Sequence, residues 1–461
     1  DHSVGLSSDI EIPAEQNGAI HTNFKLSSAG ETVYLSDENN TVLDSLSYPE
    51  LKTNESFGRI ANTNNTGIFT QTTPGRINNT QAYTQRLSKP ELSHAGGFFT
   101  ESFTLSWNPQ NGDQTQSIAP IYYTTDGSIP TTNSPQLTDQ GIEIESTVVI
   151  RFRAIEEGVL PSDIKTETYF INENHELPVI SISTDPENLW SDHKGIYVVG
   201  TNGTGGNGHD NANWNQDWEI PIGFEFYDQE KIKQLDTGAG AKIFGGWSRL
   251  NAMKSLAIFF RSEYGLGEVD YRFFKDKDIT QFESIVLRNS GNDFSSQGHS
   301  MFRDGLMQTL VQDTEIDGLG FQPAVVYLNG EYWGIHNIRE KINEHYVASN
   351  GRVQPDEIDL LYNGSGLNYF AASNGSVDDY DALIEYVQRN LLVFPALYER
   401  VQDMMDMDNY IDYVAAQIYY ANTDWPGNNT KLWKSQHPSG KWRWILYDTD
   451  FGFGLSYGGQ A

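Results

Sequence analysis

The chain has 461 residues, which at about 150 residues per domain corresponds to about three folding units and argues against a single small module. Its 38% hydrophobic residues and 42 glycines are typical of a globular chain that buries a core. Thirty Lys and Arg against 62 Asp and Glu give a formal charge of -32, which argues against a broad electrostatic surface for nucleic acid or an anionic membrane. We therefore expect cations or basic groups as partners.

The residue types also limit the kinds of site the chain can carry and its cellular location. No cysteine occurs, so disulfides, thiolate metal sites and Cys nucleophiles are excluded. The longest nearly apolar run, Leu391 to Tyr398, is far shorter than the ~20 residues that span a bilayer, so we expect a soluble chain. The sequence begins at Asp1 without a leader, and we expect any export signal to be absent from it. Abundant Asn, Gly and Thr with an acidic surface favour an extracytoplasmic bacterial protein, secreted or on the cell surface.

The first 173 residues are predicted to be all-β. Short apolar stretches broken by Gly, Asn, Ser and Pro include period-two segments at Thr32–Leu35 and Thr147–Arg153. A polar stretch at Thr73–Thr84 and another that ends at Pro178 separate the blocks. We expect domains at 1–82, 83–173 and 174–461.

The third block changes pattern from strands to helices. The predicted strands are Val179–Thr184, Gly195–Gly200, Ile222–Tyr227, Lys254–Phe260, Ser284–Asn289 and Ala324–Ile338, the last with a hairpin at Asn329-Gly330. Helical spacing begins at Met301, where one apolar stripe is expected to contain Phe302, Leu306, Met307, Leu310 and Val311. Two further helices are predicted within Asp378–Leu392 and Asp408–Asp424. The pattern indicates an α+β domain.

Two resemblances concern the N-terminal blocks. Asn23–Asp37, Ser56–Ile60 and Thr73–Asn78 resemble a lamin-tail domain, which implies an immunoglobulin-like β-sandwich used for adhesion or spacing. Gly96–Trp107 and Tyr122–Thr131, with a Thr-Asp-Gly turn, resemble the small β-sandwich appended to chitobiases and hexosaminidases. In those enzymes the module is accessory, so the resemblance does not imply glycosidase activity.

The third block, Leu177–Ala461, resembles the CotH family of secreted, spore-coat-type atypical kinases. The segments that carry the resemblance are Gly195–Gly200, Trp218–Asp228, Gly245–Gly265, Val286–Asp293, Met301–Met307, Val325–Val347, Ala421–Asn429 and Tyr447–Gly454. The resemblance implies two N-terminal all-β sandwich modules followed by an α+β atypical protein-kinase-like domain. It also implies transfer of the ATP γ-phosphoryl group to Ser or Thr hydroxyls. Mg²⁺ is the expected metal ion, and Mn²⁺ and Ca²⁺ are the alternatives.

Phosphoryl transfer needs a carboxylate near the attacking hydroxyl, oxygen ligands for the metal and a cation on the phosphates. Asp424 stands five residues before Asn429, the interval between the catalytic Asp and the metal-binding Asn of protein kinases. We predict Asp424 as the base and Asn429 as a metal ligand. The alternative is an ordinary polar turn after a helix.

Asp448 and Asp450 follow the strand-like segment that ends at Tyr447. If the strand continues, both carboxylates point to one face and hold one or two metal ions. Asp450-Phe451-Gly452 spells the tripeptide of ordinary kinases. In the secreted kinases that the chain resembles, however, the metal-binding Asp precedes a Phe-Gly pair by about five residues, which ranks Asp448 first. A solvated acidic turn or a structural Ca²⁺ site is the alternative.

The phosphate-binding cations are expected near a glycine-led turn. Lys254 opens a strand as the strand-borne lysine of kinases does, and Arg249 could add a bidentate phosphate contact. Glu340 is expected to orient Lys254, with Glu344 as its competitor. The alternative for all of them is surface cations and a salt-bridged glutamate.

Three further segments leave alternatives open. Thr201–Trp218 has the glycine content of a phosphate-covering loop but no regular motif, so a plain loop is the alternative. Arg303 and Asp304 either form structural ion pairs or reach the site. No close histidine pair or nucleophile elbow occurs, whereas a pair of glycosidase carboxylates stays open among 62 acids.

The second hypothesis for the whole chain is a non-catalytic surface protein. In it, a degenerate kinase fold and the two sandwiches bind a glycan or a host or coat partner, which the 12% aromatic content motivates. For the kinase, the expected partner is a protein substrate or a surface or coat protein. Neither hypothesis includes nucleic acid or a membrane span.

Overall fold

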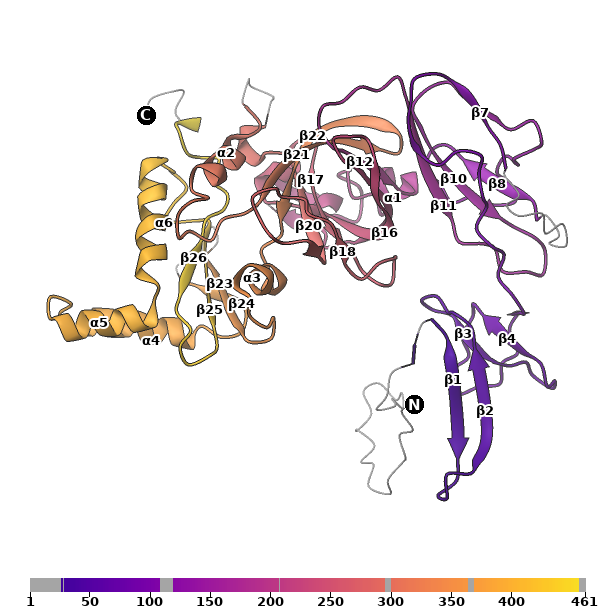
Figure 1. Ribbon diagram of the computed structural model, residues 1–461, viewed down its shortest axis with the longest axis horizontal. Helices are drawn as coiled ribbons and strands as arrows, with labels where there is room; N and C mark the ends of the chain where they lie inside the picture. Colours follow the sequence, from indigo (N-terminus) through magenta and orange to yellow (C-terminus); the bar gives the residue numbers. More distant parts are fainter. Residues whose placement is uncertain are drawn as a thin grey trace.

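Figure 1 shows the computed structural model, which describes residues 26–27, 29–107, 119–206, 208–294, 300–363 and 369–455. The beginning of the predicted first domain, 1–25, lies outside the described residues. Its described part contains a hairpin of β1 (Glu31–Ser36) and β2 (Val42–Tyr48) and a sheet of β3 (Ser56–Arg59), β4 (Thr66–Phe69) and β5 (Ala82–Tyr83). The strand predicted at Thr32–Leu35 is confirmed as part of β1.

The next module consists of two small sheets around one apolar core. Its four-stranded sheet has the order β6 (Gly97–Phe99), β11 (Lys165–Ile171), β10 (Val148–Ala154) and β8 (Ile121–Thr124). The second sheet pairs β7 (Phe103–Leu105) with β9 (Ile142–Ile144). Alternate residues of β10, Ile150 and Phe152, enter the core, as the period-two pattern predicts.

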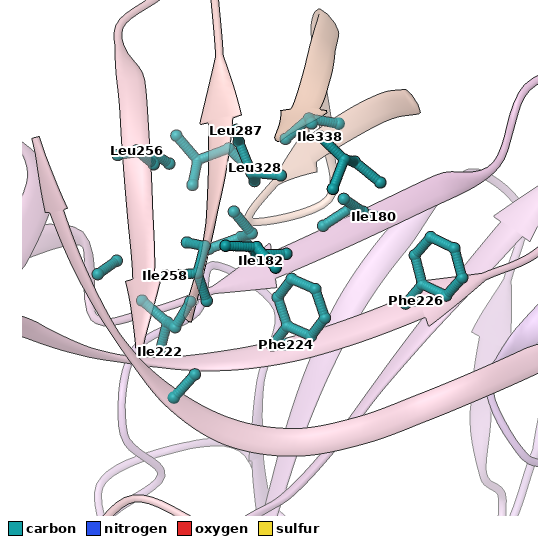
Figure 2. Close-up of a cluster of buried hydrophobic side chains, with 14 of the residues drawn as sticks. Ile180, Ile182, Ile222, Phe224, Phe226, Leu256, Ile258, Leu287, Leu328 and Ile338 are labelled. Atoms are coloured by element: carbon teal, nitrogen blue, oxygen red, sulfur yellow. The ribbon is translucent and has the colours of Figure 1, made fainter. Parts of the chain in front are cut away.

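A closed seven-stranded barrel follows. Its order is β12 (Val179–Ser183), β15 (Ile220–Tyr227), β16 (Lys233–Phe244), β17 (Ser255–Phe259), β20 (Ser284–Arg288), β22 (Glu331–Glu340) and β21 (Phe321–Leu328). The parallel pair of β12 and β21 closes it. Figure 2 shows its interior, filled by alternate side chains such as Leu256, Ile258, Leu287 and Ile338. Because side chains alternate along a strand, Arg288 and Arg339 lie on the outer face of the barrel.

The predicted strand at Gly195–Gly200 is wrong. After the short helix α1 (Pro186–Trp190), the backbone amides of Ile196 and Tyr197 donate to the carbonyls of Asn188 and Leu189. This segment therefore satisfies its backbone by folding back on α1, and its two apolar side chains join the barrel core. The short pairs β13 (Thr204–Gly206) with β14 (His209–Ala212) and β18 (Val269–Asp270) with β19 (Gln281–Phe282) complete this region.

The other α-helices of the described residues follow the barrel strand β20 in the sequence. They are α2 (Arg303–Leu310), α3 (Glu344–Gly351), α4 (Asp378–Arg389), α5 (Pro395–Met404) and α6 (Met407–Tyr419). A sheet with the order β24 (Ala371–Asn374), β23 (Ile358–Asn363), β25 (Thr430–Ser435) and β26 (Arg443–Ile445) lies with them in the yellow and orange part of Figure 1. The helices predicted within Asp378–Leu392 and Asp408–Asp424 are confirmed. Among the described residues, no helix combines the length and apolarity that crossing a membrane requires.

The stripe predicted on α2 is partly wrong. Met307 is buried, whereas Leu306 and Leu310 are exposed. The helix approaches the barrel through Gly305, where an added Cβ would lie 2.4 Å from the ring of Phe321. Close approach at a glycine thus decides the packed face of this short helix, rather than the larger apolar side chains. The described chain is mostly β with few helices, and its likeness to a kinase fold stays a prediction.

Candidate functional site

Two acids lie in a turn directly after β26, which we call the acidic turn (Asp448–Asp450). The strand ends at Ile445, so the expected strand continuation through both acids is wrong. Their carboxylates nevertheless meet, because Asp448 has a positive φ of 53° that turns the backbone back. Asp tolerates this left-handed conformation better than most residues. The side chain of Asp448 is 28% exposed and that of Asp450 is fully buried.

Arg288 joins the two acids. Its Nη2 donates to Oδ1 of Asp448 at 2.5 Å and to Oδ2 of Asp450 at 2.9 Å. It reaches them from the outer face of the barrel. Arg288 is not among the predicted site residues, although an arginine at the end of the otherwise apolar strand Ser284–Arg288 was a usable signal.

A second ion pair supports the acidic turn from behind. Asp304, on α2, accepts hydrogen bonds from the backbone amide and the hydroxyl of Thr449, both at 2.9 Å. Arg339 donates to the other oxygen of Asp304 at 2.5 Å. Burial raises the pKa of Asp304, but the two arginines and the Thr449 bonds together lower it to about 2. The sequence left open whether Arg303 and Asp304 reach the site. Asp304 contacts the acidic turn, whereas Arg303 donates to the backbone carbonyls of Gly452 and Phe453, which follow that turn.

The acidic turn carries more negative charge than its cations offset. Burial, followed by the charge of Asp448, raises the pKa of Asp450 to about 7. Oδ1 of Asp450 is buried and has no hydrogen-bond partner among the described residues. An unpaired buried carboxylate oxygen is costly unless a proton, water or cation satisfies it. Carboxylate oxygens are donors that Mg²⁺ takes in proteins, and Oδ1 of Asp450, which Arg288 does not bind, fits that ion.

Asp424 and Asn429 meet as their spacing predicts. Nδ2 of Asn429 donates to Oδ2 of Asp424 at 2.6 Å, and Nδ2 of Asn428 donates to the same oxygen at 3.0 Å. Because the amide nitrogen of Asn429 binds Asp424, the amide oxygen is the atom with which Asn429 could hold a cation. Burial raises the pKa of Asp424, and the nearby charge of Asp448 raises it further. The two predicted loops thus approach one another.

Lys431 is a second cation near the acidic turn that is not among the predicted site residues. It is half-buried in β25, with Nζ 5.2 Å from the centre of the Tyr447 ring. Burial and, to a smaller extent, the charge of Lys341 lower its pKa to about 8, although the charge of Asp448 acts to raise it. Asp448 is thus flanked by Arg288 on one side and Lys431 on another.

Lys254 is not brought to the acids. Its Nζ lies 4.1 Å from the centre of the Trp214 ring, and it donates to the carbonyls of Arg249 at 2.5 Å and Asn251 at 3.1 Å. Lys254 lies two residues before Leu256, and side chains two residues apart on a strand point to the same face. It therefore points to the inside of the barrel rather than to the outer face, where Arg288 lies. Arg249 likewise donates to backbone carbonyls, Gly245 at 2.5 Å and Trp214 at 3.0 Å. Both cations hold the turn between β16 and β17.

The expected pairing of Glu340 with Lys254 is wrong. Oε2 of Glu340 accepts from Nζ of Lys277 at 2.6 Å and from the amide of Gly320 at 2.7 Å. The carbonyl of Lys254 instead faces His336, four residues earlier on β22. The two side chains are therefore separated along the strand. Glu344, the competitor, lies in the first turn of α3.

The glycine-rich segment covers the turn that Lys254 holds. It forms β13, β14 and a short 3-10 helix, and Arg249 binds the carbonyl of Trp214 within it. An added Cβ at Gly208 would lie 2.3 Å from Leu250. The segment thus packs on the β16–β17 turn. Asn207 lies outside the described residues.

We expect Lys254→Met to loosen this turn and to leave the acids unchanged. Two carbonyls lose their donor, and a net hydrogen bond contributes about 1 kcal/mol, so amide exchange across residues 246–251 should rise about thirtyfold. Metal affinity should stay within about twofold of the wild-type value. Hydrogen exchange followed by mass spectrometry, with calorimetry, measures both. Unchanged exchange together with lost nucleotide binding would contradict this assignment.

Comparisons with known proteins find two matches within the chain. Residues 241–458 match the family model described as CotH kinase protein. Residues 95–166 match the chitobiase/beta-hexosaminidase C-terminal domain. No curated protein matches the chain significantly. The first matched region contains Arg288, Asp424, Asn429 and the acidic turn.

Proposed function

Because the chain carries a CotH kinase region behind a chitobiase-type module, we propose that it is a secreted atypical protein kinase. It would transfer the γ-phosphoryl group of ATP to Ser or Thr hydroxyls with Mg²⁺. The observation that supports this proposal most is the approach of Asp424 and Asn429 to the acidic turn, with Arg288 between the barrel and the acids.

The roles follow from the donor atoms. Asp448 and the amide oxygen of Asn429 would hold the metal ion, and Asp450 would be a further carboxylate ligand. When bound, Mg²⁺ supplies positive charge that offsets the charge on the phosphate oxygens. Asp424 would accept the proton of the substrate hydroxyl, because its raised pKa makes it a stronger base than an exposed Asp.

The cations that face the phosphates would be Arg288 and Lys431 rather than Lys254 and Arg249. Arg288 comes from the barrel and Lys431 from the C-terminal sheet, and both act on Asp448. A guanidinium fork suits phosphate oxygens. For Lys254 and Arg249 we propose a positioning role at the β16–β17 turn, and for Glu340 the orientation of Lys277.

Calorimetry with ATP tests the proposal. We expect heat of binding in the presence of Mg²⁺ and a much weaker signal with chelator, and labelled γ-phosphate should appear on a Ser- and Thr-containing protein acceptor. Parallel titrations with Mn²⁺ and Ca²⁺ identify the preferred ion. Absence of both heat and transfer with every ion would reject the kinase.

The second candidate is a non-catalytic surface protein. The β1–β2 hairpin favours it, because Tyr34, Leu35 and Leu43 on this hairpin are exposed by 63%, 57% and 64%. Binding of a polysaccharide or a coat protein, without heat from ATP and Mg²⁺, would support this candidate.

A further inference from the structure

The chitobiase-type module contacts the barrel through β11, whose two faces are both buried. Tyr169 and Ile171 pack in the module's own core, whereas Phe170 packs with residues of the barrel. Thr168 points the same way as Phe170, and its hydroxyl lies 2.7 Å from that of Ser181 on β12. A strand that is buried on both faces belongs to the interior of a larger unit, not to the surface of an appended module.

Aromatic side chains form the apolar part of this contact. Phe98 and Phe170 stack with ring centres 4.4 Å apart, both from the module. The ring of Phe170 lies 4.9 Å from that of Tyr327 and 5.4 Å from that of Tyr227, both from the barrel. Phe170, Tyr227 and Tyr327 are almost fully buried, so separating the two parts would expose a large apolar surface.

A buried charge cluster crosses the same contact. Nζ of Lys233, on β16, lies 2.6 Å from Glu167 of the module and 2.8 Å from Glu225 of β15. Both glutamate side chains are 2% exposed. With Asp236 they have the spacing of a metal site, but the ammonium of Lys233 already lies among all three. The cluster is therefore an ion-pair network between two domains.

The Thr-Asp-Gly turn of the module fits against the barrel hairpin. An added Cβ at Gly127 would lie 2.4 Å from Oδ1 of Asn329 and 2.4 Å from the carbonyl of Thr184. Oδ1 of Asn329 accepts from the amide of Thr184 at 2.8 Å, and Arg151 holds the carbonyl of Gly127 at 2.6 Å. Only glycine allows this approach.

From these contacts we propose that the chitobiase-type module is an internal support of the barrel. The module and the barrel fold and unfold as one unit, and the face of β11 that carries Thr168 and Phe170 binds the barrel instead of a glycan. The functional unit thus begins near residue 95 and includes β12 and β15, which precede the matched CotH region. This proposal does not depend on kinase activity.

A continuous series of contacts connects the chitobiase-type module with the candidate site through β21. This strand pairs with β12 on one side and with β22 on the other. Arg339 on β22 binds Asp304, which in turn binds Thr449 of the acidic turn. Loosening the module should therefore loosen the acidic turn.

Hydrogen exchange of the full chain over a denaturant series tests the proposal. We expect amides of β10 and β11 to lose protection at the same denaturant concentration as those of β12 and β15. In Lys233→Met, which leaves the buried Glu225 without a cation and Glu167 with Lys165 alone, the opening equilibrium of all four strands should rise by about a hundredfold or more. Lys242→Met is the matched control, since Lys242 pairs with the exposed Asp217 away from this contact.

A milder variant keeps the test decisive if Lys233→Met does not fold. Thr168→Val preserves shape but removes a hydroxyl that binds Ser181 and Glu225, so opening of both parts should rise by about tenfold. Earlier opening of the module strands, with the barrel strands unchanged in both variants, would overturn the proposal. Kinase assays have no part in this outcome.

Discussion

Asp448→Asn is expected to reduce phosphoryl transfer by about a hundredfold or more, and Asp448→Ala to abolish it. The carboxylate of Asp448 is the more exposed of the two in the acidic turn, and Arg288 holds it in place. Removing a charged group that acts on the transition state costs rate rather than core packing. Transfer of labelled γ-phosphate and the binding of Mn²⁺, followed by electron paramagnetic resonance, measure the two effects separately.

The asparagine variant gives the cleaner comparison. Residue 448 has a φ of 53°, a conformation that Asn adopts readily but that costs Ala about 1–2 kcal/mol. A loss of activity in Asp448→Ala alone would therefore mix strain with chemistry. Asp278→Asn is the matched control, because the side chain of Asp278 is 91% exposed. Full transfer by Asp448→Asn would remove Asp448 from the proposed site.

Local patterns predicted the strands of the barrel except β16 (Lys233–Phe244), and they did not predict its closure. Alternation in Val179–Thr184 and Ser284–Asn289 shows which residues face the core, because side chains alternate within one strand. The parallel pairing of β12 with β21 joins Val179 to Val325, and nothing local specifies this long-range register. The same limit applies to the predicted division into domains, which stays a prediction.

In the candidate site, too, contacts between residues near in the sequence were predictable and contacts between distant residues were not. Asp424 and Asn429 meet because they lie only five positions apart in one turn. The contact of Arg288 with Asp448 joins residues that are 160 positions apart, so the sequence pattern did not reveal it. Alternation, however, was sufficient to place Lys254 on the inner face with Leu256 and Ile258. The prediction that Lys254 binds phosphate followed instead from its resemblance to the strand lysine of kinases.

Asp424→Asn is expected to lower kcat by about 10²- to 10⁴-fold, the usual contribution of a general base, while ATP and Mg²⁺ affinity changes little. The amide cannot accept the substrate proton, yet its oxygen still accepts from Asn428 and Asn429. In the wild type, kcat should rise with pH through the raised pKa of Asp424, because only the carboxylate is a base. The variant should lose that rise. Steady-state kinetics from pH 4 to 8 measures both.

Stability separates this role from a structural one. The pKa of Asp424 is raised on folding, so the native state binds more protons than the unfolded state between the unfolded value of 3.8 and the raised one. This carboxyl therefore contributes stability at low pH that is lost as pH rises through its folded pKa. Asp424→Asn removes that loss and should be at least as stable as the wild type at neutral pH. The control Asp408→Asn, at an exposed position in the first turn of α6, should lose no more than the small stabilisation that a negative charge gives at a helix start. A variant that unfolds more easily at neutral pH, with kcat intact, would make Asp424 a structural residue of its turn.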